Sequence, residues 1–370
     1  MIAMTPHAMP NSPRPSPRTI ESSARSASLA DVAALAGVST GTVSRTLSKP
    51  EMISEATRAR VMAAADRLGY VVNGAARALA MRRTKTIGAV VPRFGSSSFP
   101  AMIQALEATL AEQGYTLLLS APEGRREQEP GILRAMLERG VDAVALLGAD
   151  QPPAILSMLA ANRTPFVQMW APPGSGSDAV GFDEHAAGAH VVAHLAALGH
   201  KRIGFVGGHS KDSERARHRF EGLALALARH DMALDERAII ETEYGFAEGF
   251  AAMQAILARR TPVTAMVFGT DYLAAGALAA LDQGGIAVPK KLSVASFNDN
   301  DFAAYLHPPL TTVRLPIREI GEAAGRLLLA RLGGEHFEPP ALHVELIVRA
   351  STGPAEPTGP RAPGGAIAPA

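Results

Sequence analysis

Short apolar runs alternate with amphipathic helical stretches along the chain from Thr86 onward. Buried strands that alternate with helices predict parallel sheets covered by helices on both faces. Because roughly 265 residues are too many for one such sheet, we expect two lobes with a cleft between them, in which a ligand binds beyond the carboxyl ends of the strands. The runs expected to form strands are 87–91, 116–120, 143–147, 166–169, 203–206, 265–268 and 292–297, and the main helical patterns are 102–112, 132–139, 186–197, 220–229 and 273–281.

The segment before these runs has a different pattern, with short helices and no strand between residues 28 and 68. Gly37 stands where a tight turn needs a positive φ, and Ser39 is a good N-cap residue for the helix that follows. Val43 belongs to the inward face of that second helix, and Ser54 is expected to cap a third. This order predicts a helix-turn-helix, the arrangement that places a recognition helix in the major groove of DNA.

Charge is distributed unevenly along the chain. Residues 1–85 contain 12 Arg or Lys and 5 Asp or Glu, a net charge of +7. The whole chain has 36 basic and 35 acidic residues, so residues 86–370 have 24 and 30, a net charge of −6. A basic front on an acidic body indicates a polyanionic partner for the front, with an ordinary solvated basic face as the alternative.

The second helix of the basic segment carries the side chains expected to contact DNA. Thr40 and Gly41 open this helix, where side chains reach the edges of bases. Arg45, one turn further on, can donate two hydrogen bonds to guanine or bind a phosphate. The hydroxyl groups expected to meet phosphates belong to Ser39, Thr42 and Ser44. The alternative is a small three-helix structural module without a DNA partner.

The run Leu29–Leu47, together with the segments 54–70 and 73–86, strongly resembles the LacI/GalR (lac-repressor-like) family of transcriptional regulators. The resemblance continues through the body of the chain to the run Pro308–Val313. It implies an N-terminal all-α helix-turn-helix domain followed by an α/β periplasmic-binding-protein-like (type I) effector domain of two lobes. It also implies a double-stranded DNA operator, a small-molecule effector and a homodimer, with a tetramer as the alternative.

The expected domain boundaries follow this order. They are 1–27 for a disordered arm, 28–72 for the DNA-binding domain, 73–85 for a hinge helix and linker, 86–350 for the effector-binding and dimerisation domain, and 351–370 for a disordered tail. The two lobes are expected at 86–182 plus 315–342 and at 183–314 plus 343–350.

The hinge of the family matches the Ala-rich stretch 73–81. In the family this stretch becomes a short helix only on the cognate operator, where a leucine matching Leu79 wedges between base pairs in the minor groove. An isolated helix of this length is marginal in water, which agrees with folding on DNA. The hinge residues expected to contact DNA are Asn73, Ala76, Arg77 and Leu79, and an Ala-rich linker without groove contact is the alternative. Because Gly41 replaces the larger side chains common in the family, the operator of a relative cannot be carried over.

The resemblance also implies a set of effector-binding positions. Arg219 matches an arginine that binds ligand hydroxyls or a carboxylate, and an arginine fork suits a bidentate oxyanion. Asn298 replaces an aspartate of the family, which removes a negative charge and makes an acidic ligand more tolerable. The other expected effector contacts are Ser96, Ser98, Phe99, Trp170, Tyr244 and Thr270. Because the run Val180–Asp183 is similar to gluconate-repressor-type members, the effector is expected to be a sugar or a sugar acid. The alternative for each of these side chains is that it only covers the surface or fills the core.

Other chemistries lack a sufficient motif. The chain has no cysteine, which excludes a disulfide framework, a thiolate metal site and a cysteine nucleophile. His190 and His194 have a metal-like spacing on one helical face, but no third ligand is evident. No Ser/His/Asp arrangement or carboxylate pair supports catalysis. We therefore expect no metal and no cofactor, with an α/β sugar-processing enzyme or a sugar-binding protein that carries a DNA-binding module as the alternative.

The sequence contains no sign of membrane insertion or export. No apolar run reaches the roughly 18–20 residues of a membrane span. Residues 1–27 lack the apolar central region of a signal peptide. We expect a cytoplasmic protein that has no membrane partner.

Overall fold

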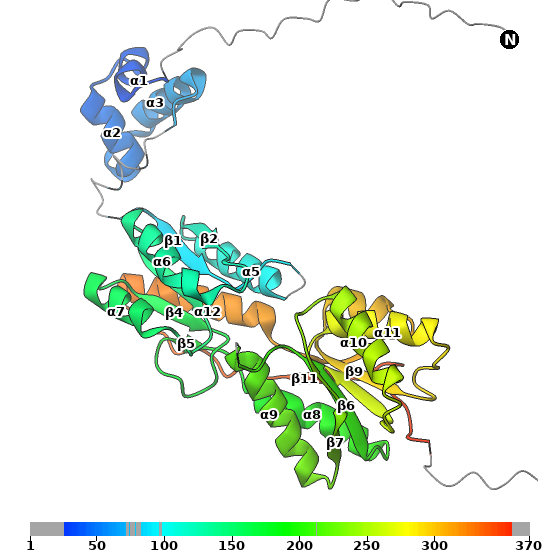
Figure 1. The fold of residues 1–370 in the computed structure, drawn as a ribbon. Coiled ribbons are helices and arrows are strands. Elements are labelled where there is room, and N and C mark those ends of the chain that lie inside the picture. Colours follow the sequence, from blue (N-terminus) through cyan, green and yellow to red (C-terminus); the bar gives the residue numbers. More distant parts are fainter. Residues whose placement is uncertain are drawn as a thin grey trace, which may run out of the picture. The chain divides into compact units, whose positions relative to one another are not determined.

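The computed structural model describes residues 26–71, 74, 78, 83–95, 98–211 and 213–356. The chain divides between Arg82 and Arg83 into two compact units (Figure 1). The expected DNA contacts Asn73, Ala76, Arg77 and Leu79 lie outside the described residues, as do Ser96, residues 1–25 of the predicted arm and residues 357–370 of the predicted tail.

The first unit is a bundle of short helices. Its helices are α1 (Leu29–Ala36), α2 (Thr40–Ser48), the short η1 (Pro50–Met52) and α3 (Glu55–Leu68). Gly37 ends α1 with φ +65°, as the turn requires, and Ser39 caps α2 through its side chain. Val32, Val43 and Val61 are fully buried and join the three main helices in one core. The predicted all-α helix-turn-helix is confirmed.

Ser54 occupies the N-cap position of α3, as expected, but without a capping side-chain hydrogen bond. Its hydroxyl donates instead to Thr57 Oγ1 at 3.0 Å. The Ser54 hydroxyl therefore pairs with a side chain of the first helical turn and not with a backbone amide.

The first lobe of the second unit contains a parallel sheet of five strands in the order β2-β1-β3-β4-β5. Its strands are β1 (Thr86–Val90), β2 (Thr116–Ser120), β3 (Ala143–Leu147), β4 (Phe166–Met169) and β5 (Ala179–Val180). Its helices are α5 (Phe99–Ala111), η2 (Arg126–Gln128), α6 (Glu129–Glu138), α7 (Pro153–Asn162) and, from far along the chain, α12 (Ile317–Gly333). Helix α12 lies against α5 so closely that a Cβ at Gly321 would overlap the backbone of Met102.

The second lobe contains a sheet of six strands in the order β11-β10-β9-β8-β6-β7. Its strands are β6 (Arg202–Gly207), β7 (Ala233–Glu241), β8 (Ala265–Phe268), β9 (Ser293–Asn298), β10 (Thr311–Arg314) and β11 (Glu345–Ile347). All neighbours are parallel except β10 and β11. The helices of this lobe are α8 (Glu184–Ala197), α9 (Glu214–Arg229), α10 (Phe246–Ala258), α11 (Asp271–Gln283) and the short η3 (Asp301–Tyr305). The predicted two-lobed α/β body is confirmed.

The start of the predicted disordered tail is wrong. Ser351 is fully buried, and its hydroxyl accepts from the Thr311 amide at 2.7 Å and donates to the Val294 carbonyl at 2.6 Å. The amide of Ala355 donates to the Leu198 carbonyl at 2.8 Å. Residues 351–356 therefore belong to the second lobe. The hydroxyl of Ser351 satisfies backbone groups of β9 and β10, and the Pro- and Gly-rich composition of the tail gives no sign of these contacts.

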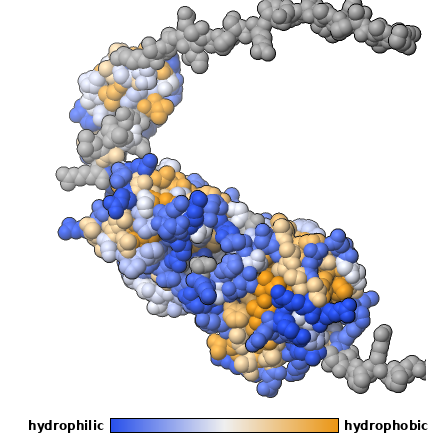
Figure 2. Space-filling view, viewed as in Figure 1, coloured by the Kyte–Doolittle hydropathy of each residue, from blue (hydrophilic) through white to orange (hydrophobic). Residues whose placement is uncertain are grey.

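The surface of the second unit combines polar and apolar regions. On the face seen in Figure 2, hydrophobic residues gather over the lobe that carries α10 and α11. Phe246, at the start of α10, is 50% exposed. No helix in the described part of the chain is both long and apolar enough to cross a membrane.

Candidate nucleic-acid interface and effector cleft

The outer face of α2 presents the residues expected to contact DNA. Ser39, Thr40, Gly41, Ser44 and Arg45 are exposed, and Thr42 is half-buried. The opposite face is buried through Val43 and Thr46. Because side chains four positions apart share a helical face, Arg45 lies above Gly41.

The start of α2 is locally fixed by hydroxyl groups. Ser39 Oγ accepts from the Thr42 amide at 3.1 Å and lies 2.9 Å from Thr42 Oγ1. The remaining amides at the start of a helix are available to a phosphate, which the helix dipole favours. A Cβ at Gly41 would meet only Arg45 Nη2 and Ser39 Oγ, both at 3.8 Å, so the fold does not require a glycine there.

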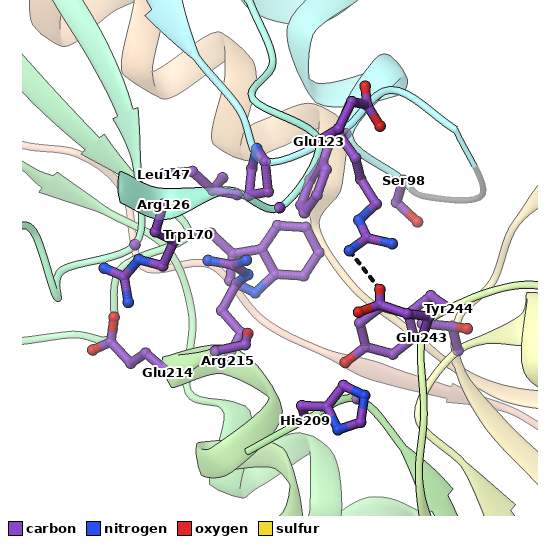
Figure 3. A pocket seen from close by; sticks show the side chains of 18 of the residues that line it. Ser98, Glu123, Arg126, Leu147, Trp170, His209, Glu214, Arg215, Glu243 and Tyr244 are labelled. Atoms are coloured by element: carbon purple, nitrogen blue, oxygen red, sulfur yellow. Dashed lines mark ion pairs between the residues drawn. The ribbon is translucent and has the colours of Figure 1, made fainter. Parts of the chain in front are cut away.

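A cleft of about 510 Å³ lies between the two lobes of the second unit (Figure 3). Its walls come from the ends of strands and the starts of helices in both lobes, as expected for sheets of this kind. The structure brings seven of the expected effector residues to this cleft: Ser98, Phe99, Trp170, Arg219, Tyr244, Thr270 and Asn298.

Aromatic rings form one wall of the cleft. The rings of Phe99 and Trp170 meet edge to face, with centroids 5.8 Å apart. Trp170 also lies 5.8 Å from the ring of Phe182, which is buried behind it. The backbone of Trp170 has φ +58°, a left-handed conformation that is costly for a large side chain. Such a wall suits the apolar face of a sugar ring.

Arg219 does not present a free fork to the cleft. Its Nε donates to Glu184 Oε2 at 3.0 Å and its Nη2 to Glu184 Oε1 at 2.8 Å, while its Nη1 donates to the Gly269 carbonyl. Both side chains of the pair are almost completely buried. Burial acts to lower the pKa of Arg219, but the adjacent Glu184 carboxylate raises it above the ordinary value. Glu184 therefore already occupies one edge of the guanidinium, and two N–H groups of Arg219 are left for a ligand.

Sequence reasoning missed Glu184. This residue lies in the first turn of α8, a position where an acidic side chain is common on a helix surface. Its Oε1 also accepts from Trp170 Nε1 at 2.8 Å, so the carboxylate joins the first lobe to the second. Glu184 thus places a negative charge beside the cleft, where Asn298 has replaced the aspartate of the family with a neutral side chain.

Asn298 and Thr270 provide polar atoms at the ends of β9 and β8. Asn298 has φ +112°, and its Oδ1 is buried without a hydrogen-bond partner in the described part of the chain. A buried acceptor without a donor is costly, so a ligand that donates to it is favoured. Thr270 Oγ1 caps α11 by accepting from the Leu273 amide at 3.4 Å.

Asp271 forms a buried polar network beneath the cleft. Its Oδ1 accepts from Ser296 Oγ at 2.5 Å and Thr312 Oγ1 at 2.7 Å, and its Oδ2 accepts from the amide and side chain of Asn300. Burial raises the pKa of Asp271 to about 6 in spite of these hydrogen bonds. Asn300 Oδ1 in turn accepts from Ser98 Oγ of the first lobe at 3.2 Å. The family pattern marks the position of Asp271 but not the partners that form this network.

Further contacts join the lobes at the mouth of the cleft. Arg93 of the first lobe forms an ion pair with Glu243 of the second at 2.6 Å (Figure 3). Glu214, at the start of α9, accepts from the amides of Ala149 and Asp150 at 2.9 and 3.0 Å. The two lobes therefore meet on both sides of the cleft in this structure.

The comparisons with known proteins agree with this architecture. Residues 28–73 match the family described as bacterial regulatory proteins, lacI family, and residues 192–352 match the periplasmic binding protein-like domain. The HTH-type transcriptional repressor PurR of Photobacterium profundum is 32% identical over 329 residues, which cover 88% of this chain and 98% of the relative.

Solved structures are similar to this chain over most of its length. The lac repressor dimer bound to operator and the anti-inducer ONPF has a TM-score of 0.79 at 25% identity, over 89% of this chain and all of that one. The transcriptional regulator CelR in complex with cellobiose has a TM-score of 0.64 at 31% identity, over 88% and 99% of the two chains.

A helix-turn-helix unit joined to a two-lobed body with a cleft defines a DNA-binding regulator that responds to a small molecule. The chain belongs to the LacI family of bacterial transcriptional regulators. It is a regulator and not an enzyme, because the relatives that it matches over nearly their whole length are transcriptional repressors.

Proposed function

We propose that this protein is a cytoplasmic repressor that binds a pseudopalindromic operator as a homodimer and releases or retains it according to a sugar or sugar acid in the cleft. The observation that carries the proposal is the chemistry of the cleft. It combines an aromatic wall with Asn298 Oδ1, a buried acceptor that has no hydrogen-bond partner among the described residues. A polyhydroxylated ligand satisfies both, because its ring face is apolar and its hydroxyls donate hydrogen bonds. The cellobiose complex of CelR supports this ligand class.

On the DNA side, the exposed face of α2 would read the major groove. Arg45 would bind guanine or a phosphate, and the other members of the face are Ser39, Thr40, Gly41, Thr42 and Ser44. The hinge at 73–85 would fold on the operator, with contacts from Asn73, Ala76, Arg77 and Leu79. One recognition helix in each chain needs two half-sites for useful specificity, which is the reason for a dimer.

A partly exposed aromatic cluster, formed by Phe246, Tyr272 and Phe302, supports self-association. The rings of Phe246 and Tyr272 lie 5.1 Å apart, and both contact Phe302 at 5.8 and 5.0 Å. Exposed aromatic groups of this kind are enriched at protein interfaces. Sedimentation of the purified protein tests the dimer, and replacement of Phe246 by Ser should shift the equilibrium toward the monomer.

Control by the effector would act through the relative position of the lobes. A ligand in the cleft contacts both lobes and changes the contacts that already join them, such as Arg93 with Glu243. The first lobe follows the hinge directly in the chain, so its rotation would change the spacing of the two hinges in a dimer. Coupling of this kind is typically about 1–3 kcal/mol and acts equally on effector and operator affinity.

Genome-wide footprinting of the purified protein, with and without a panel of sugars and sugar acids, tests the proposal. We expect protection of a small set of pseudopalindromic sites, with an occupancy that changes when one panel member is added. Protein that protects no site with or without any solute would contradict the repressor assignment. A turnover assay on the same panel separates the enzyme alternative, because a regulator returns its ligand unchanged.

A further inference from the structure

We infer that Arg215 is the anion-binding residue of the cleft and that the effector is a sugar acid, whose carboxylate Arg215 binds, rather than a neutral sugar. The inference rests on the proposed function, because it assumes that the cleft binds the effector. It assigns the carboxylate to a different arginine from Arg219, and it depends on how the cationic side chains of the cleft are partnered.

Five arginines line the cleft: Arg93, Arg125, Arg126, Arg215 and Arg219. Three of them have acidic partners, namely Glu243 for Arg93, Asp150 for Arg126 and Glu184 for Arg219. Arg125 is exposed, and its Nε donates to the Pro122 carbonyl. Arg215 alone forms neither a hydrogen bond nor an ion pair with any residue that the structure describes.

The position of Arg215 makes it a contact of both lobes. It lies in the first turn of α9 in the second lobe and extends into the cleft (Figure 3). Its guanidinium carbon is 5.5 Å from the ring centroid of Phe99, which belongs to the first lobe. Its Nη1 would lie 3.3 Å from a Cβ at Gly148, also in the first lobe. An anion held here therefore lies between the lobes.

Acidic side chains lie near Arg215, but none of the described ones forms an ion pair with it. Burial lowers the pKa of Arg215 because it disfavours the cation, and the nearby Arg219 has the same effect. An arginine nevertheless remains protonated in proteins. The carboxylates of Glu184 and Glu214 act against this lowering, but Glu184 is paired with Arg219 and Glu214 accepts from the amides of Ala149 and Asp150. A half-buried cation without an ion-pair partner is stabilised by an anionic ligand, and the start of α9 adds the positive end of a helix dipole.

The remaining groups of the cleft describe the rest of the ligand. Asn298 Oδ1 accepts from a hydroxyl, and Arg219 has two N–H groups left for hydroxyl oxygens. Phe99 and Trp170 provide the aromatic wall. A carboxylate at Arg215 and hydroxyls at the other two sites are the chemical features of an aldonate or a uronate.

Calorimetry with matched acids and neutral sugars tests this inference at constant ionic strength. The probes are D-gluconate, D-galactonate, D-glucuronate and D-galacturonate, against D-glucose and D-galactose. The variant is Arg215→Gln, with Arg229→Gln as the control, because Arg229 is an exposed arginine at the other end of the same helix. Thermal melts establish that both variants fold.

We expect the wild type to bind at least one acid more tightly than the matched neutral sugar. Arg215→Gln should weaken that acid about 10- to 100-fold, as expected for loss of a charge-assisted hydrogen bond, and should leave neutral sugars unchanged. Arg229→Gln should bind the acid like the wild type.

Three results would overturn the inference: a neutral sugar that binds as tightly as any acid, an acid whose affinity survives Arg215→Gln, or a panel in which no acid binds. Each of them leaves the proposed repressor intact if operator occupancy still responds to some solute. Loss of all operator binding would instead refute the proposed function.

Discussion

Glu184 and Arg219 form a bidentate ion pair beneath the cleft, with N–O distances of 3.0 and 2.8 Å. The pair lies within the second lobe, but Glu184 also accepts from the indole of Trp170 in the first. Glu184, which holds the proposed ligand contact Arg219 in place, is therefore hydrogen-bonded to the opposite lobe.

Removal of Glu184 should destabilise the second unit strongly. Glu184→Ala leaves the buried guanidinium of Arg219 without its counter-ion, a change that typically costs about 3–5 kcal/mol. Urea denaturation measures the loss in the free energy of unfolding. Glu221→Ala, which removes an exposed carboxylate from α9, should change it by less than about 0.5 kcal/mol. Equal stability of the two variants would show that the ion pair is not needed.

Arg45 should be needed for specific operator binding but not for effector binding. Loss of a bidentate contact to a base costs about 1–3 kcal/mol, and a dimer loses it twice. Arg45→Ala should therefore abolish specific binding in a gel-shift assay and leave the calorimetric affinity for the effector unchanged. Arg139→Ala removes an exposed positive charge from the second unit and serves as the control. Operator affinity equal to that of the wild type in Arg45→Ala would refute the assignment of α2.

Replacement of Asn298 by Gly should separate stability from ligand binding. The backbone of Asn298 has φ +112°, and strain of this kind costs about 1–3 kcal/mol, which a glycine relieves. The same change removes the unpartnered acceptor Oδ1. We expect an unchanged or higher free energy of unfolding together with weaker effector binding, measured by chemical denaturation and calorimetry. Effector affinity that does not fall would exclude Asn298 from the site.

Asp271 should give the protein a characteristic dependence of stability on pH. Its pKa is raised from 3.8 to about 6 in the folded protein, so the folded state binds more protons than the unfolded state between these pH values. The contribution of Asp271 to stability therefore falls as the pH rises through this window, by about 3 kcal/mol for about two pKa units.

Asp271→Asn should remove this contribution. The free energy of unfolding of the wild type, minus that of Asp271→Asn, should decrease between pH 4.5 and pH 7. Asp282→Asn, an exposed position on the same helix, should give a flat difference. A flat difference for Asp271→Asn as well would mean that the carboxylate titrates near its ordinary pKa.

Ser351 should stabilise the second lobe although it lies in a Pro- and Gly-rich tail. Ser351→Ala leaves the buried Thr311 amide without its acceptor, which costs about 1–3 kcal/mol. Thermal or urea denaturation measures the effect, with Ser157→Ala on the exposed face of α7 as the control. If Ser351→Ala is as stable as the control, the tail does not contribute to the fold.

Most of the fold could be predicted because its central strands are continuous apolar runs. The strands at 143–147 and 265–268 lie in the interior of a parallel sheet, and all their residues except Leu147 are buried. Strand β7 was missed because it is an edge strand that contains Asp235, Glu236 and Arg237. Strands β5 and β11 were missed because they are only two and three residues long.

The candidate site could be predicted only in part. Family resemblance indicated positions such as Trp170 and Arg219, and these do line the cleft. The partners of those side chains depend on how α8 and α9 lie against each other, which no local pattern encodes. Glu184 and Asp271 were missed for this reason, and Arg215 is informative only because its neighbours are already paired.

Helix α12 returns to the first lobe after the chain has built most of the second, and β11 then leads back again. The polypeptide thus passes from lobe to lobe at three places: between β5 and α8, between β10 and α12, and between α12 and β11. Because three connections join the lobes, a movement of one lobe must be absorbed by all three segments. Neither lobe is formed by one continuous segment of the sequence, so an insertion or truncation at one of these crossings should disturb both lobes together.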